Sequence, residues 1–448
     1  MPPRNLAVIL FTVVLSLWCY RKADHGGYAA ALADAMKKVR MYYVEEIDSR
    51  QLFENAMTGM VEDSLDQYSS YIAPDSFRKM EEDLDQEFGG VGIEIEKKEA
   101  SPLLVLSPLV GSPAYREGLR AGDTIYAIDG ESTLEMSRDD CVDRMRGKPG
   151  SPVVLKVLSS GEQDPIDVSI VREMIVVQSV LGDTRDTDGS WDFHLVRDPR
   201  IGYLRIGTFG KHTVEELHDV IDNPANRDFE ALLVDLRHNA GGLLNTAVST
   251  CDLFVGDGRI VSTRGRDGSI GREYDATAEV AVPKEMPIVV LVNGFSASAS
   301  EIVAACLQDY RRAVIVGERT YGKGTVQNVL EMEGGRSALR LTTATYWRPS
   351  GVNIHRLNDA EEDDDWGVRP DQDFEVIVAE DEANQVFDDR RNRDIHRDGV
   401  ATEGEEDDTE PRLPVEDRQL KRALEYLQHQ LEGTERTEVT ETTPLSVP

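Results

Sequence analysis

Ser298 and Lys323 have the residue types and the spacing that covalent catalysis of acyl transfer requires. Ser298 lies in a small-residue turn between a buried-strand pattern over 288–292 and a helical pattern, and Lys323 follows a second apolar run over 313–316. A serine hydroxyl at a helix N-terminus lies where backbone dipoles favour an oxyanion, and a lysine with a buried stem can act as a base. Strand, serine, helix, strand and lysine is the order that a Ser-Lys dyad needs.

Ser298 also fits a purely structural role. The pattern Ser298-x-x-Glu301 before an apolar helix is typical of a capping box, in which both side chains satisfy backbone amides of the first helical turn. Capping serines are common and nucleophilic serines are rare, so the turn alone favours the cap. The pairing with a glycine-bracketed lysine is what favours catalysis.

Three motifs resemble the C-terminal processing peptidases, also called tail-specific proteases. They are the sequence SASASE around Ser298, the sequence GKGTVQ around Lys323, and DLRHNAGG over 235–242. The resemblance covers roughly residues 30–380. It implies that Ser298 is the nucleophile, that Lys323 is the general base and that Gln327 orients the lysine.

The resemblance also implies an oxyanion hole. Its backbone N–H donors would be Ala299 and a glycine of the pair Gly241 and Gly242, while Ser296 and Ser300 would be structural. A strand that ends in paired glycines before a helix leaves N–H groups for an anion. The loop departs from the family pattern at Ala240, where most members have proline, and we expect this to alter loop stiffness more than chemistry.

Lys323 must be a neutral amine to accept the serine proton. Its pKa would have to fall from about 10.4 to roughly 7 to 8, which burial in an apolar pocket supplies by disfavouring the charged form. We expect Val314, Val316 and Val326 to provide such a pocket. A histidine triad built on His238 or His355 is the rival mechanism, and no family pattern supports it.

A second glycine-rich stretch, from Phe88 onward, is followed by alternating apolar residues. Alone it is more often a turn, but GLRAGDTI over 118–125 and the IDG sequence at 128–130 follow at the spacing of a PDZ domain, which we expect over 86–175. This resemblance implies capture of a peptide C-terminus by strand addition. The candidate peptide-binding residues are Gly89, Gly90, Val91, Gly92 and Ile93.

The fold class that these features imply is α/β, or α+β over several domains. The resemblance implies a crotonase/Clp-like catalytic core of β-sheet with flanking helices, an inserted PDZ domain and an N-terminal helical region. The predicted segments are a signal peptide or anchor over 1–22, helices over 28–85, the PDZ domain over 86–175, the peptidase domain over 176–380, an acidic disordered linker over 381–414, a helix over 415–432 and a polar tail over 433–448.

Charge and cysteine content limit which partners and cofactors we expect for this chain. A formal charge of −34 over 448 residues argues against nucleic acid, because no basic patch is available to displace counterions from phosphate. The four cysteines have no close-spaced pair, so neither a zinc ribbon nor a disulfide framework is indicated. We expect protein or peptide substrates bound by their C-termini and no metal or organic cofactor. A homodimer is compatible with these features.

The N-terminus indicates export. An apolar run over 6–20 follows a single Arg4 and has the length of a signal-peptide core, but no small-residue cleavage pattern follows it. This slightly favours an uncleaved anchor, with the catalytic part outside the cytoplasm, in the periplasm, held at the inner membrane. The alternatives are a cleaved signal and a buried N-terminal helix.

The function that these residues favour is a serine endopeptidase that recognises protein C-termini through its PDZ domain. A different class of function is a secreted peptide-binding scaffold with an idle dyad. Ser298, Lys323 and Gln327 are all present, which favours the enzyme. A hydratase-like enzyme with a similar core lacks any sequence motif for coenzyme binding.

Overall fold

The computed structural model describes most of the chain. The described residues are 11–14, 16, 27–277, 280–361, 363–395 and 416–441, with side chains as far as 433 in the last helix. The predicted signal or anchor over 1–22 lies almost entirely outside them, as do residues 396–414 of the predicted linker and the end of the predicted tail. No helix within the described residues is long and apolar enough to cross a membrane.

The chain forms two compact units. One comprises residues 1–77 with 327–342, and the other comprises 78–326 with 343–448. The N-terminal segment of the first unit contains helices and one short strand that the sequence pattern did not predict; these elements are α2 (Gly27–Tyr42), α3 (Ser49–Val61), β1 (Ser70–Ile72) and the start of α4 (Pro74–Asp85). β1 pairs antiparallel with the first half of β21 (Ser337–Trp347), with Tyr71 opposite Leu339.

The part of the second unit that was predicted as a PDZ domain is a small antiparallel sheet around its own core. The strand order is β3-β4-β5-β7-β8, so β3 is an edge strand, and β2 pairs separately with β9. Helix α6 lies over this sheet, and Cys141 and Met145 belong to the core. The elements are β2 (Glu87–Gly90), β3 (Ile93–Glu96), β4 (Leu103–Pro108), α5 (Pro113–Arg116), β5 (Thr124–Ile128), β6 (Glu131–Ser132), α6 (Arg138–Met145), β7 (Pro152–Leu158), β8 (Ile166–Val171) and β9 (Glu173–Val176).

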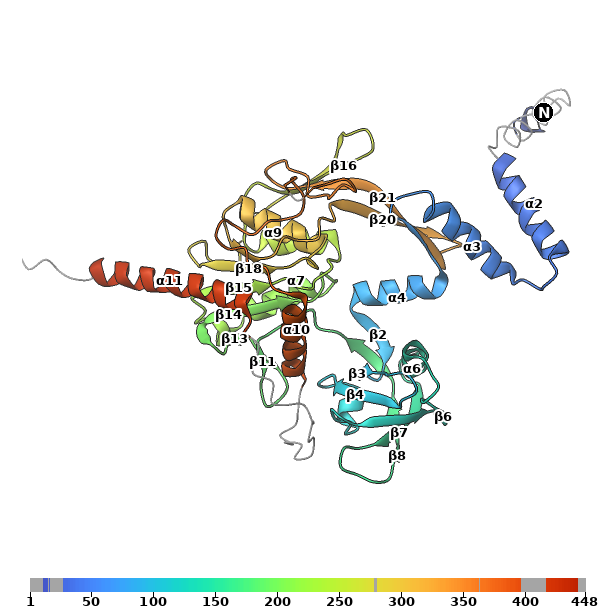
Figure 1. Ribbon diagram of the computed structural model, residues 1–448, viewed down its shortest axis with the longest axis horizontal. Helices are drawn as coiled ribbons and strands as arrows, with labels where there is room; N and C mark the ends of the chain where they lie inside the picture. Colours follow the sequence, from blue (N-terminus) through green and yellow to red (C-terminus); the bar gives the residue numbers. More distant parts are fainter. Residues whose placement is uncertain are drawn as a thin grey trace, which may run out of the picture. The chain divides into compact units, whose positions relative to one another are not determined.

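The largest core packs on one face of a mostly parallel sheet. Figure 1 labels several strands of this sheet, β14, β15 and β18 among them. The strand order is β10-β14-β15-β18-β19, with β14, β15, β18 and β19 parallel and with β13 on the side of β14. The strands are β10 (Val180–Leu181), β13 (His194–Leu195), β14 (Asp198–Ile206), β15 (Ala231–Asp235), β18 (Ile288–Val292) and β19 (Val314–Gly317). The carboxyl ends of the parallel strands meet at one edge of the sheet, where ligand sites of such sheets are found.

Both faces of this sheet are covered. Alternate residues of β18 belong to different cores: Val290 packs towards α7, α8 and α9, and Leu291 packs towards α11. A strand buried on both faces must be apolar at every position, which explains the unbroken apolar runs in the sequence. The helices are α7 (Thr213–Ile221), α8 (Leu244–Asp252), α9 (Ala299–Asp309) and α11 (Arg418–Glu441).

A second sheet lies beside α8 and α9. Its strands in this unit are β16, β17 and the last residues of β21, with Thr263 opposite Tyr346. Strands β20 and β21 pair with each other and are shared by both units. The remaining elements are β11 (Thr184–Arg185), β12 (Trp191–Asp192), η1 (Pro224–Asn226), β16 (Arg259–Arg264), β17 (Ile270–Asp275) and β20 (Thr325–Met332).

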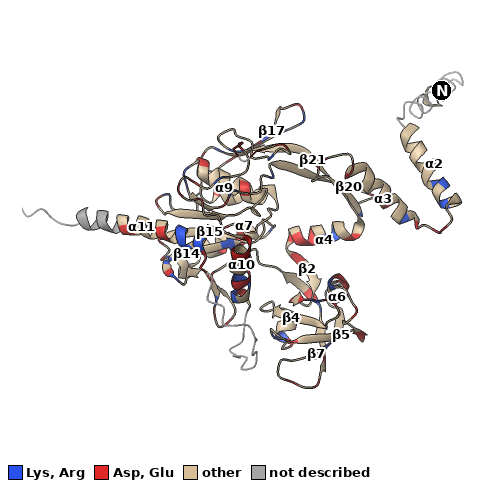
Figure 2. Ribbon diagram, viewed as in Figure 1, with Lys and Arg blue, Asp and Glu red and all other residues tan. Residues whose placement is uncertain are grey.

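The prediction of a disordered linker over 381–414 is wrong for its first part, which forms helix α10 (Glu380–Asp394). Acidic residues occupy its first turn and arginines its last turn, as the helix dipole favours (Figure 2). Arg390 is buried and pairs with Asp183 at 2.7 Å, which fixes the helix to the sheet. Helix α11 docks on the core as expected and extends to Glu441, into the predicted polar tail.

Candidate active site

Ser298 lies in a strained turn between β18 and α9. Its backbone has φ 56° and ψ −112°, in a region that side chains other than glycine rarely adopt. Such strain is typical of strand-to-helix turns that present a nucleophile. Ser298 is buried, with 8% of its surface exposed.

The three serines of the SASAS turn have different partners. Ser296 donates its hydroxyl to the Leu236 carbonyl at 2.8 Å, and Ser300 donates to the Asn239 carbonyl at 2.9 Å. Both are completely buried. Their predicted structural role is therefore confirmed.

The hydroxyl of Ser298 has a different neighbour, the phenol of Tyr346. Burial is the larger effect on the Tyr346 phenol and raises its pKa to about 12, while interaction with Ser298 lowers this pKa. Tyr346 comes from β21, and its backbone N–H donates to the Gly324 carbonyl at 2.7 Å, next to Lys323. Sequence reasoning missed this tyrosine, because no local pattern relates it to the serine.

Glu301 joins the serine turn to the lysine loop. Its Oε2 accepts the backbone N–H of Ser298 and that of Lys323, both at 2.8 Å. Its Oε1 accepts the Gly322 N–H at 2.7 Å and the Thr320 hydroxyl at 2.6 Å. The two dyad residues therefore have their backbones on the same carboxylate oxygen, although they are 25 positions apart (323 − 298).

Glu301 is fully buried, which raises the pKa of its carboxyl, while the four hydrogen bonds act in the opposite direction. The glutamate half of the predicted capping box is present, since Glu301 accepts the backbone N–H of Ser298. Capping and catalysis are therefore not alternatives in this turn. The cap is the contact that holds the serine beside the lysine loop.

The glycines around Lys323 allow close packing. Gly322 has φ 87°, and a Cβ there would meet Arg356 and Trp366, while a Cβ on Gly324 would meet the backbone of His355. The prediction that Val314 and Val316 form a pocket for Lys323 is wrong. Both side chains face the core beneath α11. Because alternate residues of β19 point to opposite faces, neither of them packs with Val326, which lies against the core on the α9 side.

The glycine loop after β15 is fastened to the serine turn by Asn239. The Asn239 carbonyl accepts the Ala297 N–H at 3.0 Å, and its side chain donates to Ile206 at 2.8 Å. A Cβ on Gly241 would lie 2.9 Å from Ser298 Cβ and 3.0 Å from the Ala299 nitrogen. The loop backbone therefore lies directly against the serine.

The two glycines differ in what their amides can do. The Gly241 N–H donates to Asn239 Oδ1 at 2.8 Å and is not available to an oxyanion. The Gly242 N–H donates no hydrogen bond within the described residues, and Gly242 is exposed. Of the predicted donors, Ala299 and Gly242 remain, while Gly241 provides the space for close approach.

Gln327 belongs to the other compact unit. Its side-chain amide donates to the Thr342 hydroxyl at 3.3 Å, and Thr342 donates to Asp66 at 3.0 Å. The sequence assigned no chemistry to the segment that contains Asp66. The role of Gln327 in orienting Lys323 stays a prediction.

The predicted peptide-binding residues of the small sheet divide into two groups. Gly89 and Gly90 are paired within β2, opposite Met174 and Glu173, and are not part of an open loop. Val91 and Gly92 form the turn that leads into β3, which begins at Ile93. Gly92 has φ 75°, and its carbonyl accepts the Leu109 N–H at 3.0 Å. The free edge of β3 is the geometry that strand addition requires.

Comparisons with known proteins agree with these motifs. The chain matches the model of peptidase family S41 over residues 200–374 and that of the PDZ domain over residues 104–159. It is 39% identical to the carboxy-terminal-processing protease of Bartonella bacilliformis, over 76% of this chain and 74% of that protein. It is 31% identical to the carboxyl-terminal-processing protease of Synechocystis, over 74% of this chain and 73% of that protein.

Solved structures are also similar. The photosystem II D1 C-terminal processing protease is 26% identical, with a TM-score of 0.42, over 77% of this chain and 92% of that one. A peptidase family S41 protein from Bacteroides fragilis is 18% identical, with a TM-score of 0.42.

Proposed function

Since the chain belongs to peptidase family S41, as a carboxy-terminal processing protease with a PDZ domain, we propose that it cleaves peptide bonds with a Ser298–Lys323 dyad. The observation that carries this proposal is the shared carboxylate of Glu301. Its Oε2 accepts the backbone N–H of both dyad residues at 2.8 Å. The serine turn and the lysine loop are thereby held side by side.

In the proposed reaction, neutral Lys323 accepts the proton of the Ser298 hydroxyl as Oγ attacks the scissile carbonyl. The bond between carbon and Oγ forms, and negative charge moves to the carbonyl oxygen. As the intermediate collapses, the C–N bond breaks and the lysine ammonium returns its proton to the leaving amine. A water molecule, deprotonated by Lys323, then hydrolyses the acyl-enzyme and releases Ser298.

The developing oxyanion is held by the N–H groups of Ala299 and Gly242. Ala299 is the first residue of α9, where the amides of the first turn have no partner inside the helix. Donors that are already aimed before reaction cost no reorganisation in the transition state, which is why such groups are worth about 10²–10³ in rate. The family role of Gln327, orienting the lysine, is kept as a prediction.

The PDZ domain selects substrates with a free C-terminus. A peptide would add as a further strand to the open edge of β3, with its carboxylate at the turn formed by Val91 and Gly92. The competing function, a binding scaffold with an idle dyad, would use the same edge without turnover. The two differ in whether Ser298 reacts.

We also propose that the protein acts outside the cytoplasm, in the periplasm, held at the inner membrane by its N-terminus. The support is the apolar run over 6–20 in the sequence. Fractionation of cells that produce the full chain tests this, with the protein expected among the membranes and accessible from outside the inner membrane. The predicted homodimer stays a prediction.

The experiment that tests the peptidase mechanism compares Ser298→Ala and Lys323→Ala with wild type. Peptides with free and amidated C-termini are digested, and a fluorophosphonate probe reports the reactivity of the serine. We expect both variants to stay folded and to lose peptidase activity by at least about 10³-fold, because dyad residues act as a unit. Wild type should become labelled at Ser298.

Two exposed residues provide matched controls. Ser269 lies in the turn between β16 and β17, and Lys421 forms a surface ion pair with Glu416. The variants Ser269→Ala and Lys421→Ala should both keep full activity. Turnover retained by Lys323→Ala would return the base role to a histidine. A wild-type protein that binds peptides but neither cleaves them nor becomes labelled would favour the scaffold.

A further inference from the structure

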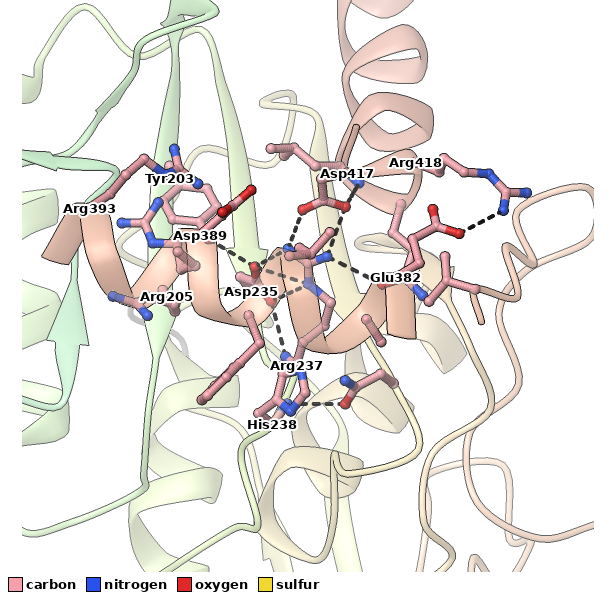
Figure 3. A pocket seen from close by; sticks show the side chains of 18 of the residues that line it. Tyr203, Arg205, Asp235, Arg237, His238, Glu382, Asp389, Arg393, Asp417 and Arg418 are labelled. Atoms are coloured by element: carbon pink, nitrogen blue, oxygen red, sulfur yellow. Dashed lines mark hydrogen bonds and ion pairs between the residues drawn. The ribbon is translucent and has the colours of Figure 1, made fainter. Parts of the chain in front are cut away.

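A cavity of about 1000 Å³ lies at the carboxyl edge of the parallel sheet. Residues that follow β14, β15, β18 and β19 line it on one side, and α10 and the start of α11 line the other (Figure 3). Most of its charged side chains are paired, as Arg237 is with Asp235 and Asp417. Its lining includes aliphatic residues and three neighbouring rings, those of His238, Phe295 and Phe387, which we call the aromatic platform.

The three rings pack on one another and still face solvent. His238 stacks on Phe295 with centroids 5.3 Å apart and an interplanar angle of 18°, and it meets Phe387 at 4.8 Å. Phe295 is 65% exposed and Phe387 is 44% exposed. The fold gains little from apolar rings left in water, so grouped exposed rings are typical of a binding surface.

The platform is attached to the catalytic loops. Asn293 Oδ1 accepts the His238 N–H at 3.0 Å and the Phe295 N–H at 3.2 Å, so one side chain fixes the positions of both residues. Phe295 precedes Ser298 by three positions, and His238 precedes Gly242 by four. The rings therefore extend from the same two loops that carry the nucleophile and an oxyanion donor.

Helix α10 contributes the third ring and is held in place by polar contacts. Arg390 donates to Asp183 Oδ1 and to the carbonyls of Gly182 and Asp183, each at 2.7 Å. Burial, together with the positive charge of Arg237, lowers the pKa of His238, so its ring is neutral at neutral pH. An uncharged imidazole ring can pack face-on against phenyl rings, as His238 does with Phe295.

We propose that the aromatic platform is the subsite that receives an apolar side chain of the substrate peptide, next to the scissile bond. The proposal rests on Ser298 as the nucleophile. The occupant follows from continuity along the chain: Phe295 and His238 belong to the two loops that would hold the scissile carbonyl, so substrate side chains beside that bond are the apolar groups we expect there. Aromatic rings select such side chains by the water-exposed apolar area that they remove on binding.

The test uses pairs of quenched fluorescent peptides with a free C-terminus, identical except for Leu or Ser at one position beside the bond that is cut. The measured quantity is the ratio of kcat/KM for the Leu peptide to that for the Ser peptide. We expect Phe295→Ala and Phe387→Ala each to lower this ratio by about tenfold, the range for one apolar contact in a pocket. Labelling of Ser298 by a small fluorophosphonate should keep its wild-type rate.

Two further variants make the test specific. Phe387→Leu keeps an apolar side chain on α10 and should restore most of the ratio, which separates loss of the contact from loss of the helix. Ile377→Ala removes an exposed apolar residue outside the cavity lining and should leave the ratio unchanged. Circular dichroism checks that α10 is retained.

An unchanged ratio with normal labelling of Ser298 would overturn the subsite and leave the dyad intact. A ratio unchanged while Phe295→Ala alters the molecular mass measured by light scattering would mean that the platform packs against a second copy, which also overturns it. Absence of labelling in the wild type would instead overturn Ser298 as the nucleophile, and the subsite with it.

Discussion

Two glycine-bearing segments of the second unit follow different designs. Gly241 and Gly242 lie in the loop after β15, a strand in the middle of a parallel sheet that is covered on both faces, and Gly241 packs against Ser298. Gly92 leads into β3, the edge strand of an antiparallel sheet, and a Cβ there would collide with Ser112. Both glycines allow close approach of backbone, but to different neighbours.

Under the proposed function, this difference explains why chemistry and recognition would use different places. At the carboxyl end of parallel strands, several loops converge, and their N–H groups can be aimed at one atom. Along a free edge, N–H and C=O groups form a row that pairs with an extended peptide. The first arrangement suits an oxyanion, and the second suits a peptide end.

The largest expected effect is on the serine turn and comes from Glu301→Gln, which should impair catalysis and leave peptide recognition intact. Each carboxylate oxygen accepts two hydrogen bonds, so a glutamine must turn its NH₂ group towards two donors. An unsatisfied buried group costs about 1–3 kcal/mol, and about 1.4 kcal/mol is tenfold in rate. We expect kcat/KM and the rate of serine labelling to fall together by about 10- to 100-fold, with binding of a free C-terminal peptide unchanged.

Its matched control is Asp140→Asn in the PDZ domain. Ser137 and Asp140 form the same kind of capping box at the start of α6, with the Ser137 N–H 3.2 Å from the carboxylate. This variant should lower thermal stability slightly and leave serine labelling unchanged. Equal loss of labelling in both variants would mean that Glu301 acts only through overall stability.

Gly92→Ala should impair peptide recognition at the edge of β3 and leave catalysis intact. The left-handed backbone at φ 75° and the contact with Ser112 both oppose a Cβ, so the turn before β3 must move. We expect KM for peptides with a free C-terminus to rise by about tenfold, with little change for amidated peptides or for serine labelling.

Gly130→Ala is the control for backbone strain alone. Gly130 has φ 83° in the same domain and open space around its Cβ position. This variant should cost stability without changing the preference for a free C-terminus. If both variants changed that preference equally, the edge of β3 would not be the peptide site.

The smallest expected effect comes from Tyr346→Phe, which tests whether the tyrosine beside Ser298 contributes to catalysis. The ring stays in the core, and only the hydroxyl beside Ser298 is lost. If this hydroxyl hydrogen-bonds Ser298 during the reaction, its loss costs about 0.5–1.5 kcal/mol, so we expect kcat to fall about three- to tenfold with KM unchanged. Because the pKa of Tyr346 is raised to about 12, this loss should be the same from pH 6 to pH 9.

Tyr274→Phe provides the comparison for this variant. Tyr274 lies on β17 and packs against the same core. Removal of its hydroxyl should leave kcat at the wild-type value. An equal decrease in both variants would assign the effect to the core and not to the contact with Ser298.

Much of the catalytic sheet could be predicted because its signals are local. The apolar runs that begin at 231 and 288 form strands β15 and β18, since strands that are buried on both faces are mostly apolar. Helix α10 could not be predicted in this way. Its composition is strongly polar, and what stabilises it is the pairing of Arg390 with Asp183, which lies 207 positions earlier.

The amino-acid sequence by itself determined the strands, the helix after Ser298, the family motifs and the choice of Ser298 and Lys323, because these depend on neighbours in the chain. The tertiary structure alone decided that Glu301 joins the two loops, that the Gly241 amide is already occupied, that Tyr346 lies at the site and that Phe387 packs against His238. Hydrogen-bond directions and ring contacts depend on how distant segments are placed in space, and the order of residues along the chain does not encode those placements locally.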